Sequence, residues 1–492
     1  MLLALLATTL LQTTPAAPDW EAEGRAALDA RMSVEAKKGP AKNVILFIGD
    51  GMDGTTITAA RIYQGQQRGE TGEENVLTFE SLPHTALSKT YNTDHQTPDS
   101  AGTATAILSG RKTRSGVINV DQTVPRGDCE AALGGGLETI ADFAAGTGRR
   151  VGVVTTARLT HATPASLYAS SADRDWESDA DMPKSADACT DIARQLLERA
   201  PGLNLDVAMG GGRSNFLPAE ARDPEYEKRR GGRADGRNLI EAWQESGGEF
   251  VFDDKGLRKL DTSDDAPVLG LFEPSHMAYE ADRQDGSHDP SLAEMTRFAI
   301  EKLSRSDDGY FLLVEAGRID HAHHAGNAAR ALQDTVELDA AVEAAIESAG
   351  LEDTLIMVTA DHGHTLALQG YPRRGNPILG LVMEDDEGAE TPVPAADGKP
   401  YTTLSYANGP GTLMLPDVDG GRPVLTEEEV EDVDFKQQSL IPAPSESHGG
   451  QDVIVFADGP GSWLVGGVLE QNVLYYVMEH ALGAPESASD TR

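Results

Sequence analysis

Short apolar runs recur along the chain, and each ends in glycine or polar residues. Residues 43–48 form the first run, and residues 151–154, 311–314 and 355–358 repeat the pattern. Continuous apolar runs of this length are typical of strands that are buried on both faces of a parallel sheet. Residues 453–456 are a further candidate near the C-terminus. The pattern predicts several buried strands.

Helical patterns separate these runs, for example over residues 290–303 and 328–348. Alternating buried strands and helices predict an α/β fold with a large, mostly parallel central sheet and helices on both faces. Ligands of such sheets bind beyond the carboxyl ends of the strands. Four metal-binding side chains follow or end the predicted strands: Asp50, Glu315, Asp361 and His362.

Two regions interrupt this rhythm. Residues 206–289 are rich in glycine, arginine and aspartate, and residues 375–444 are rich in proline, glycine and acidic residues. The second region is interpreted as an inserted surface subdomain, with short strands expected at 401–404 and 412–415. Outside these insertions, the chain from 41 to 492 is expected to form a single α/β domain.

The N-terminal 17 residues combine an apolar stretch with a small-residue end. This segment is too short to span a bilayer, and we expect an export signal in preference to a frayed terminus. Residues 20–36 predict a helix within an N-terminal arm of residues 18–40. The chain's two cysteines would pair in an oxidising compartment, and two unpaired buried thiols are the alternative. We expect a periplasmic or secreted protein without a membrane anchor.

The charge balance limits the partners. The chain has 80 acidic and 41 basic residues, and its formal net charge is −39. Such a surface repels nucleic acids and anionic lipids, and neither is an expected partner. An anionic substrate would need a local positive site that acts against this overall field.

Residues 97–106 contain a serine at a predicted helix start. Pro98 and Asp99 suit the first positions of a helix, and Ser100 would lie at the positive end of its dipole. That field favours an alkoxide and a bound phosphate. A simple helix cap formed by Asp99 and Ser100 is the alternative interpretation.

Metal-ligand residues cluster in short segments. Asp320 and His324 are four residues apart, so one helical turn places both on the same face. With His448 and the adjacent pair Asp361 and His362, they offer the imidazoles and carboxylates of an open zinc site. A second, all-oxygen set suits magnesium and consists of Asp50, Glu315 and Thr163. Each residue taken alone could instead be a helix cap or a surface side chain.

Two metal ions can clamp the attacking and leaving oxygens of an in-line displacement. A guanidinium would then bind the remaining phosphate oxygens in a bidentate manner. Arg174 is the candidate, and a salt bridge with Asp173 or Asp175 is the alternative that local sequence leaves open.

With these residues assembled, the chain resembles the alkaline phosphatase family, and within it the animal branch. The resemblance covers about residues 20–482 and rests on an ordered set of motifs. The matching segments are residues 48–52, 99–101, 160–164, 171–176, 314–321, 361–364 and 447–450.

The resemblance implies a role for each matching residue. Ser100 would form a phosphoserine, Arg174 would hold the phosphate, and Asp99 would lie beside them in the substrate-binding site. His161 would lie near the magnesium ion, and His321 would reach the phosphate through water. The implied metal ligands are Asp320, His324 and His448 for one zinc ion, Asp50, Asp361, His362 and Ser100 for the second, and Asp50, Thr163 and Glu315 for magnesium.

The animal branch implies further features. A Ca²⁺ site within the 206–289 insertion would be formed by Glu225, the Phe272 carbonyl, Glu273 and Asp289. Cys129 and Cys189 match a family disulfide. The N-terminal arm resembles one that wraps a partner subunit, and residues 375–444 resemble the crown at a dimer interface. The resemblance therefore implies a homodimer.

The sequence predicts a phosphomonoesterase that hydrolyses small phosphate monoesters to inorganic phosphate, with two Zn²⁺ and one Mg²⁺. A phosphodiesterase or pyrophosphatase of the same fold is one alternative, and a non-catalytic metal- or phosphate-binding protein is another. A sulfatase is disfavoured because no cysteine lies in a Cys-x-Pro-x-Arg context.

Overall fold

The computed structural model describes residues 20–283, 288–386, 389–411 and 421–483. The chain divides into two compact units, residues 1–36 and 37–492. In the first unit, helix α1 (Trp20–Met32) has no buried residue and is shorter than the predicted helix over 20–36. The predicted export signal at 1–17 and the predicted strand at 412–415 lie outside the described residues.

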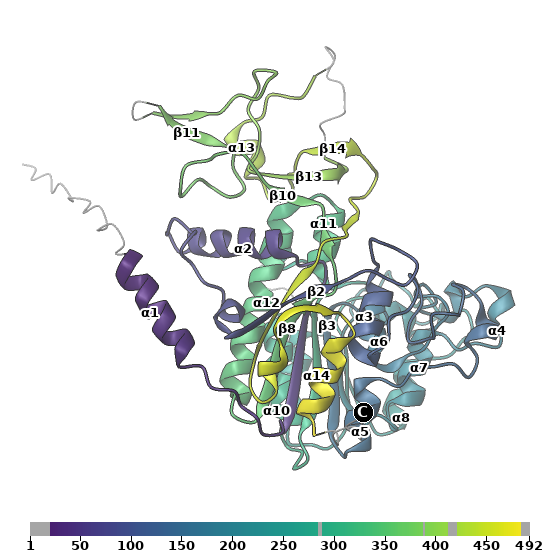
Figure 1. Ribbon diagram of the computed structural model, residues 1–492. Coiled ribbons are helices and arrows are strands. Elements are labelled where there is room, and N and C mark those ends of the chain that lie inside the picture. The colour runs from purple at the N-terminus through teal and green to yellow at the C-terminus, as the bar shows by residue number, and fades with distance from the viewer. Residues whose placement is uncertain (1–19, 284–287, 387–388, 412–420, 484–492) are drawn as a thin grey trace, which may run out of the picture. The chain divides into compact units, whose positions relative to one another are not determined.

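The second unit is built on a ten-stranded sheet in the order β17-β2-β16-β8-β1-β7-β3-β4-β6-β5 (Figure 1). Neighbouring strands are parallel except around β16 (Val453–Asp458), which runs antiparallel to both of its neighbours. The predicted α/β fold with a mostly parallel sheet is confirmed. The other strands are β1 (Asn43–Gly49), β2 (His84–Lys89), β3 (Arg150–Arg158), β4 (Leu205–Gly211), β5 (Glu249–Val251), β6 (Val268–Leu271), β7 (Tyr310–Ala316), β8 (Thr354–Ala360) and β17 (Gly467–Glu470).

Successive side chains of the central strands pack into two different hydrophobic cores, one on each face of the sheet, because strand side chains alternate between faces. In β1, Val44, Leu46 and Ile48 pack into one core, whereas Ile45 and Phe47 pack into the other. All five side chains are fully buried. This double burial explains the continuous apolar runs in the sequence.

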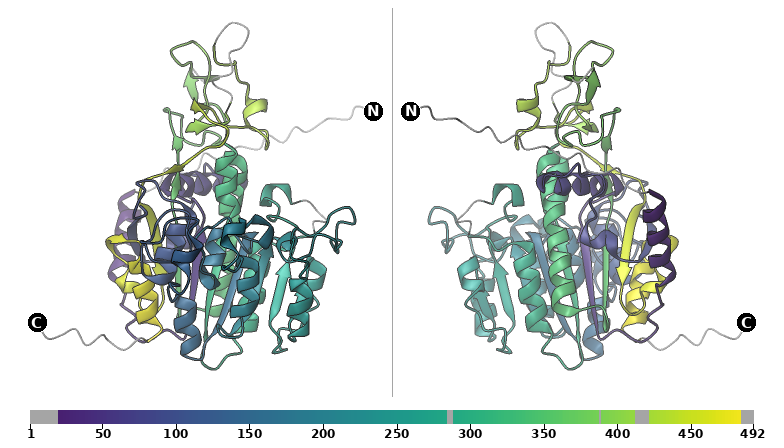
Figure 2. Two further views of the ribbon diagram at one scale, coloured as in Figure 1. Left: turned by 90° about the vertical axis from the view of Figure 1, so that its right-hand side faces the viewer. Right: turned by 90° about the vertical axis from the view of Figure 1, so that its left-hand side faces the viewer.

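Helices cover both faces of the sheet. The first core includes residues of α3 (Ser100–Ser109), α5 (Ile140–Gly146), α6 (Ala162–Tyr168), α7 (Ile192–Arg199), α8 (Leu239–Glu245) and α14 (Val473–Ala481). The second includes residues of α2 (Gly54–Gln67), α9 (Asp254–Leu257), α10 (Leu292–Leu303), α11 (Arg318–His324) and α12 (Ala328–Ala349). Figure 2 shows α10 and α12, in teal and green, side by side along the sheet.

The segment 375–444, together with β10 just before it, forms small sheets that are separate from the large one. In the first, β13 (Leu404–Gly409) lies between β10 (Leu366–Leu368) and β14 (Ser439–Pro442), and β11 (Met383–Asp386) pairs with β12 (Ala389–Pro392). This region also contains the short helix α13 (Glu427–Val430). The strand expected at 401–404 begins only at Leu404.

The segment 206–289 differs from the expected insertion. Three strands of the large sheet, β4, β5 and β6, lie wholly or mostly within it. These strands are short or glycine-containing, which weakens their pattern in the sequence. Helices α8 and α9 lie between these strands and pack into the two cores, so the insertion boundaries need this correction.

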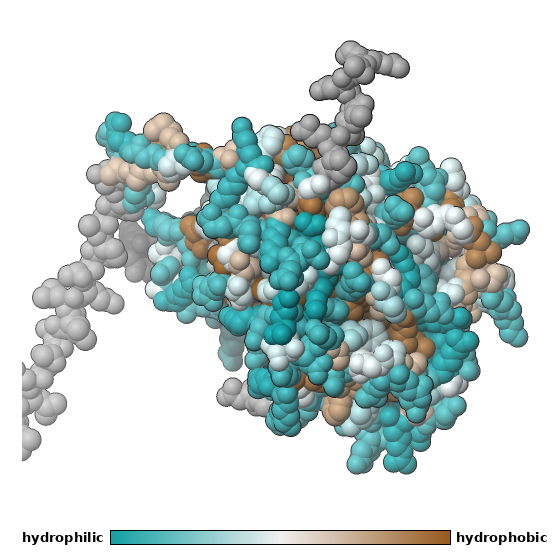
Figure 3. Space-filling model, turned by 90° about the horizontal axis from the view of Figure 1, so that it is seen from below, coloured by the Kyte–Doolittle hydropathy of each residue, from teal (hydrophilic) through white to brown (hydrophobic). Residues whose placement is uncertain are grey.

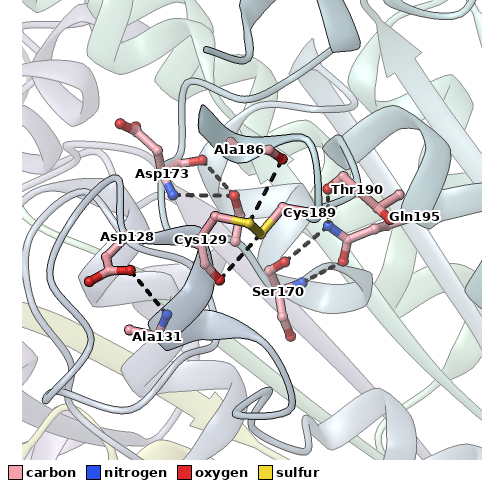
Figure 4. Close-up of a disulfide and its surroundings, with 10 residues drawn as sticks. Asp128, Cys129, Ala131, Ser170, Asp173, Ala186, Cys189, Thr190 and Gln195 are labelled. Atoms are coloured by element: carbon pink, nitrogen blue, oxygen red, sulfur yellow. Dashed lines mark hydrogen bonds between the residues drawn. A yellow bond between two sulfur atoms is a disulfide. The ribbon is translucent and has the colours of Figure 1, made fainter. Parts of the chain in front are cut away.

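The structure contains a disulfide between Cys129 and Cys189, whose Cα atoms are 5.9 Å apart (Figure 4). It joins α4 (Cys129–Ala132) to a loop 60 residues later. The bridge borders a small separate core that contains Val117, Val120 and Trp176. Few strands or long helices surround this core, so the covalent link restrains a loop-rich region.

The surface is predominantly polar, as the excess of acidic residues requires. The face in Figure 3 is mostly hydrophilic, with scattered hydrophobic side chains. Among the described residues, every helix is too short or too polar to cross a membrane.

The disulfide should contribute measurably to stability. A bridge that closes a loop of 60 residues restricts the unfolded chain, and a contribution of about 2–4 kcal/mol is expected. We predict that the double variant Cys129→Ala/Cys189→Ala unfolds at lower denaturant concentration, and that reductant affects only the wild type. An unchanged unfolding midpoint in the double variant would contradict this role.

Candidate active site

Three carboxylates lie at the carboxyl edge of three adjacent strands. Asp50 follows β1, Asp361 follows β8, and Glu315 is the penultimate residue of β7. The strand register places Glu315 beside Ile48 and pairs Gly49 with Ala360. The parallel sheet therefore brings acids that are far apart in the chain to one place.

Gly51 makes room for this convergence. Its φ of +71° is a left-handed conformation that favours glycine, and a Cβ atom there would lie 2.4 Å from the His364 ring. Its N–H donates to an Asp361 carboxylate oxygen at 3.1 Å. A side chain at this position would separate the β1 and β8 ends of the site.

Asp320, His324 and His448 form the first candidate metal cluster. The Nε2 atoms of both histidines lie 3.3 Å from Asp320 Oδ1. Each Nδ1 atom contacts a backbone carbonyl oxygen, that of Glu446 for His324 at 2.6 Å and that of Pro98 for His448 at 2.8 Å. These carbonyls fix the rings with Nε2 toward Asp320, an orientation typical of metal-ligating histidine.

His364 and Glu446 support this cluster and were missed in the sequence. His364 lies between them, with Nε2 at 2.9 Å from Asp320 and Nδ1 at 2.6 Å from Glu446. Burial opposes its charge, but these two carboxylates raise the pKa of His364 to about 10. Antiparallel pairing of β9 (Gly363–His364) with β15 (His448–Gly449) aligns His364 with His448. His364 lies two residues after His362, so the Asp361-His362 motif could have indicated it in the sequence. No nearby motif indicates Glu446.

Asp50, Asp361 and His362 form a second cluster, in which ligand atoms lie within 4.8 Å of one another. His362 Nε2 is 3.3 Å from Asp50 and 3.4 Å from Asp361. The Ser100 hydroxyl lies 3.1 Å from the same nitrogen. The serine therefore shares this site with both carboxylates.

Ser100 is the first residue of α3 and is only 2% exposed. Asp99 caps the helix and accepts hydrogen bonds from the N–H groups of Ala101 and Gly102. Asp99 therefore supplies the cap, and the Ser100 hydroxyl is left to face the second cluster. The helix dipole adds positive potential at that oxygen.

Arg174 lies beside Ser100 and does not pair with its neighbours in sequence. Its Nη1 atom is 3.1 Å from Asp99 Oδ2, while Arg126 pairs with both Asp173 and Asp175. Among the described contacts, the salt bridge with Asp173 or Asp175 that the sequence left open is therefore made by Arg126, and Arg174 pairs with Asp99 instead. Burial opposes the charge, but Asp99 raises the pKa of the Arg174 guanidinium further above its usual value.

His161 and His321 line the same side of the site. His161 Nε2 is 3.2 Å from Arg174 Nη2, and the His161 and His321 ring centroids are 5.3 Å apart. Burial lowers the pKa of His161 well below its ordinary value, and Arg174 lowers it further. Burial also lowers the pKa of His321, to about 3.

The all-oxygen set lies around Glu315. Asp50, His161 and Glu315 form a group within 4.8 Å, and Thr155 donates a short hydrogen bond to Glu315. The Thr163 hydroxyl and Glu315 Oε1 are buried without a hydrogen-bond partner among the described residues. Buried polar atoms without partners are rare, so these oxygens fit a cation ligand set.

The electrostatics of the site favour bound cations. Asp50, Glu315, Asp320 and Asp361 are all fully or nearly fully buried. Burial, followed by repulsion from Asp361, raises the pKa of Asp50 well above its usual value. Burial is also the main cause that raises the pKa of Glu315 to about 8. Divalent cations would offset this repulsion, so the residues present fit the metal ions that the sequence predicts.

The predicted Ca²⁺ ligands lie in one neighbourhood, although Glu225, Glu273 and Asp289 are not among the groups gathered within 4.8 Å in the described part of the chain. Arg213 pairs with Glu225 at 2.9 Å, and Tyr226 donates to Glu273 at 2.5 Å. Burial, then the charges of Asp289 and Glu225, raise the pKa of Glu273 to about 7. Phe272 directly follows β6 and is fully buried.

The fold and the site together define a class of protein: an α/β protein that gathers carboxylates, imidazoles and a serine around sites for divalent metal ions. The family model described as alkaline phosphatase matches residues 41–484. The chain therefore belongs to the alkaline phosphatase family.

Individual relatives cover almost the whole chain. The tissue-nonspecific isozyme of alkaline phosphatase from Gallus gallus is 44% identical over 474 residues, which cover 94% of this chain and 88% of that protein. An alkaline phosphatase from Gadus morhua is 42% identical over 472 residues, or 94% and 96% of the two chains.

Solved structures share the fold. Alkaline phosphatase from Thermus thermophilus superposes with a TM-score of 0.64 at 25% identity, covering 95% of each chain. A cold-active enzyme from Shewanella sp. has a TM-score of 0.62 at 22% identity, covering 90% of this chain and all of that one.

The buried carboxylates make the stability of the metal-free protein depend on pH. Because folding raises the pKa of Glu315 to about 8, the folded state holds a proton that the unfolded state loses above about pH 4.5. We predict that the melting temperature of chelator-treated protein falls as pH rises from about 7 to about 8, above the range in which histidines titrate in the unfolded chain. Addition of Zn²⁺ and Mg²⁺ should raise it more at the higher pH.

Glu315→Gln is the matched variant, since it removes one of the repelling charges and keeps the side-chain shape. Its metal-free form should lose less stability over the same pH interval. A pH-independent melting temperature in the metal-free wild type would refute this electrostatic description.

Proposed function

We propose that this chain is an alkaline phosphatase that hydrolyses phosphate monoesters through a covalent phosphoserine on Ser100. The observation that carries the proposal is the position of the Ser100 hydroxyl, 3.1 Å from His362 in a cluster with Asp50 and Asp361. The helix N-terminus favours the negative charge that develops during attack. Arg174 binds two phosphate oxygens, and Asp99 fixes the guanidinium for this task.

The metal ions are assigned by the chemistry of the donors. One Zn²⁺ is held by Asp320, His324 and His448, and a second by Asp50, Asp361, His362 and Ser100. Mg²⁺ is held by Asp50, Thr163 and Glu315, with His161 nearby. When bound, these ions lower the pKa of the serine hydroxyl and stabilise the charge on the leaving oxygen.

The alternatives are less well supported. A phosphodiesterase needs space for a second ester group, and the match of residues 41–484 to the alkaline phosphatase family model favours a monoesterase. A non-catalytic metal-binding protein would not need a buried serine at a helix N-terminus beside a guanidinium. Asp173 and Asp175 pair with Arg126, so the carboxylate that Arg174 contacts is Asp99, next to Ser100.

The remaining assignments are proposals from the family. The protein is exported to a periplasm or secreted, consistent with its disulfide. It forms a homodimer, with the arm of residues 18–40 around the partner and the 375–444 subdomain at the interface. Ca²⁺ is bound by Glu225, the Phe272 carbonyl, Glu273 and Asp289.

Ser100→Ala should abolish most turnover. Because the variant lacks the hydroxyl that is proposed to accept the phosphoryl group, we expect kcat on p-nitrophenyl phosphate to fall by roughly 10³-fold or more, with the zinc content retained. Ser109→Ala, at the other end of the same helix, is the matched control and should keep near-normal activity.

Phosphate trapped at low pH should appear on Ser100 in the wild type. Near-normal turnover in Ser100→Ala would overturn the assignment. A rate on bis-(p-nitrophenyl) phosphate equal to that on the monoester would favour the diesterase instead.

Ca²⁺ should stabilise the protein through the acidic loops. We predict that Ca²⁺ raises the melting temperature of the Zn²⁺- and Mg²⁺-loaded enzyme. At a Ca²⁺ concentration of 100 times the Kd, the free energy of unfolding should increase by about 2.7 kcal/mol. Glu273→Gln should lose this response, while Glu245→Gln, at the exposed end of α8, should keep it. An equal response in both variants would place the cation elsewhere.

A further inference from the structure

A third imidazole, His276, lies in the cluster beside Arg174 and plays no part in the proposed reaction so far. It belongs to the loop that follows β6, and its ring centroid is 4.0 Å from that of His321 and 5.4 Å from that of His161. His276 was not identified in the sequence, because a lone histidine in a loop carries no spacing signal.

His276 is anchored through both ring nitrogens, which contact Arg158. Its Nδ1 atom accepts a hydrogen bond from the backbone N–H of Arg158 at 3.1 Å, and the Arg158 guanidinium contacts its Nε2 atom. Arg158 Nε in turn donates to Glu177 at 2.8 Å. Glu177 also accepts hydrogen bonds from Thr160 at 2.6 Å and from Asn215 at 3.1 Å. The position of the His276 ring is therefore fixed by a network at the end of β3.

His321 has no comparable anchor on its own ring. Its Nδ1 atom is buried without a hydrogen-bond partner among the described residues. By contrast, carbonyl oxygens hold the Nδ1 atoms of His324 and His448. The closest aromatic neighbour of His321 is His276, so ring packing, not hydrogen bonding, restrains its orientation.

We infer that His276 is a positioning residue. Its ring packs against His321 and holds that ring in the orientation in which it contacts the phosphate through water. The inference rests on the proposed function, in which His321 contacts the phosphate through water. The effect of His276 on the reaction is therefore indirect. His276 forms no bond to the substrate, and its removal would act only through the orientation of His321.

Two substitutions at His276 separate ring packing from hydrogen bonding. His276→Asn keeps an oxygen that can accept from the Arg158 N–H but removes the ring. His276→Phe keeps the ring but leaves that N–H without an acceptor. If packing positions His321, His276→Asn should weaken inhibition by inorganic phosphate by roughly 10-fold, as loss of outer-sphere partners typically does. His276→Phe should stay within about 2-fold of wild type while melting at a lower temperature.

The coupling to His321 is measured by a double-mutant cycle on the Zn²⁺- and Mg²⁺-loaded enzyme. The readouts are the inhibition constant for inorganic phosphate and kcat/KM, with metal content as a control. His321→Ala alone should weaken phosphate binding, and adding His276→Asn to it should cause no further loss.

Three results would contradict the account, and they are distinguishable. If His321→Ala leaves phosphate inhibition unchanged, the proposed role of His321 fails, and the inference fails with it. If His321→Ala weakens inhibition but the His276→Asn effect is fully additive to it, the inference alone is wrong. If His276→Phe weakens inhibition more than His276→Asn does, the restraint is a hydrogen bond and not ring packing.

Discussion

Mutual repulsion among buried carboxylates is the constraint on which the rest of this structure depends. Asp50, Glu315, Asp320 and Asp361 lie out of solvent within a few side chains of one another. Folding this charge together without compensation would be costly. Bound cations would offset this repulsion, and the imidazoles of His324, His362 and His448 are placed to complete their ligand sets. In the proposed reaction the same ions would lower the pKa of the Ser100 hydroxyl and stabilise a bound phosphate, so stability and catalysis would share one cause.

The scaffold makes this convergence possible. Parallel strands bring Asp50, Glu315 and Asp361 to one edge, and the short β9–β15 pairing brings His364 next to His448. The carbonyl of Pro98 orients His448, and the chain reaches Ser100 two residues later. A single backbone segment therefore positions both His448 and Ser100, the proposed metal ligand and the proposed nucleophile. Gly51 allows the β1 end to approach closely enough.

The sequence predicted the central strands well because they are buried on both faces and read as unbroken apolar runs. The sequence did not predict β4 to β6, because their glycines and short lengths obscure the apolar pattern. Residues 206–289 were therefore interpreted as an insertion. The partners of individual side chains could not be predicted, because they lie far away in the sequence. The pairing of Arg174 with Asp99, and of Arg126 with Asp173, joins residues about 50 to 75 positions apart. His276 and Glu446 likewise have no local signal, because their roles come from residues distant in the chain.

Anomalous X-ray diffraction at the zinc absorption edge, on crystals grown with Zn²⁺, Mg²⁺ and phosphate, tests the central claim most directly. The account predicts two zinc peaks roughly 4 Å apart. One peak should be bounded by Asp320, His324 and His448, and the other by Asp50, Asp361 and His362 next to Ser100. Absence of both peaks from this edge of the sheet, with the carboxylates still buried together, would contradict it.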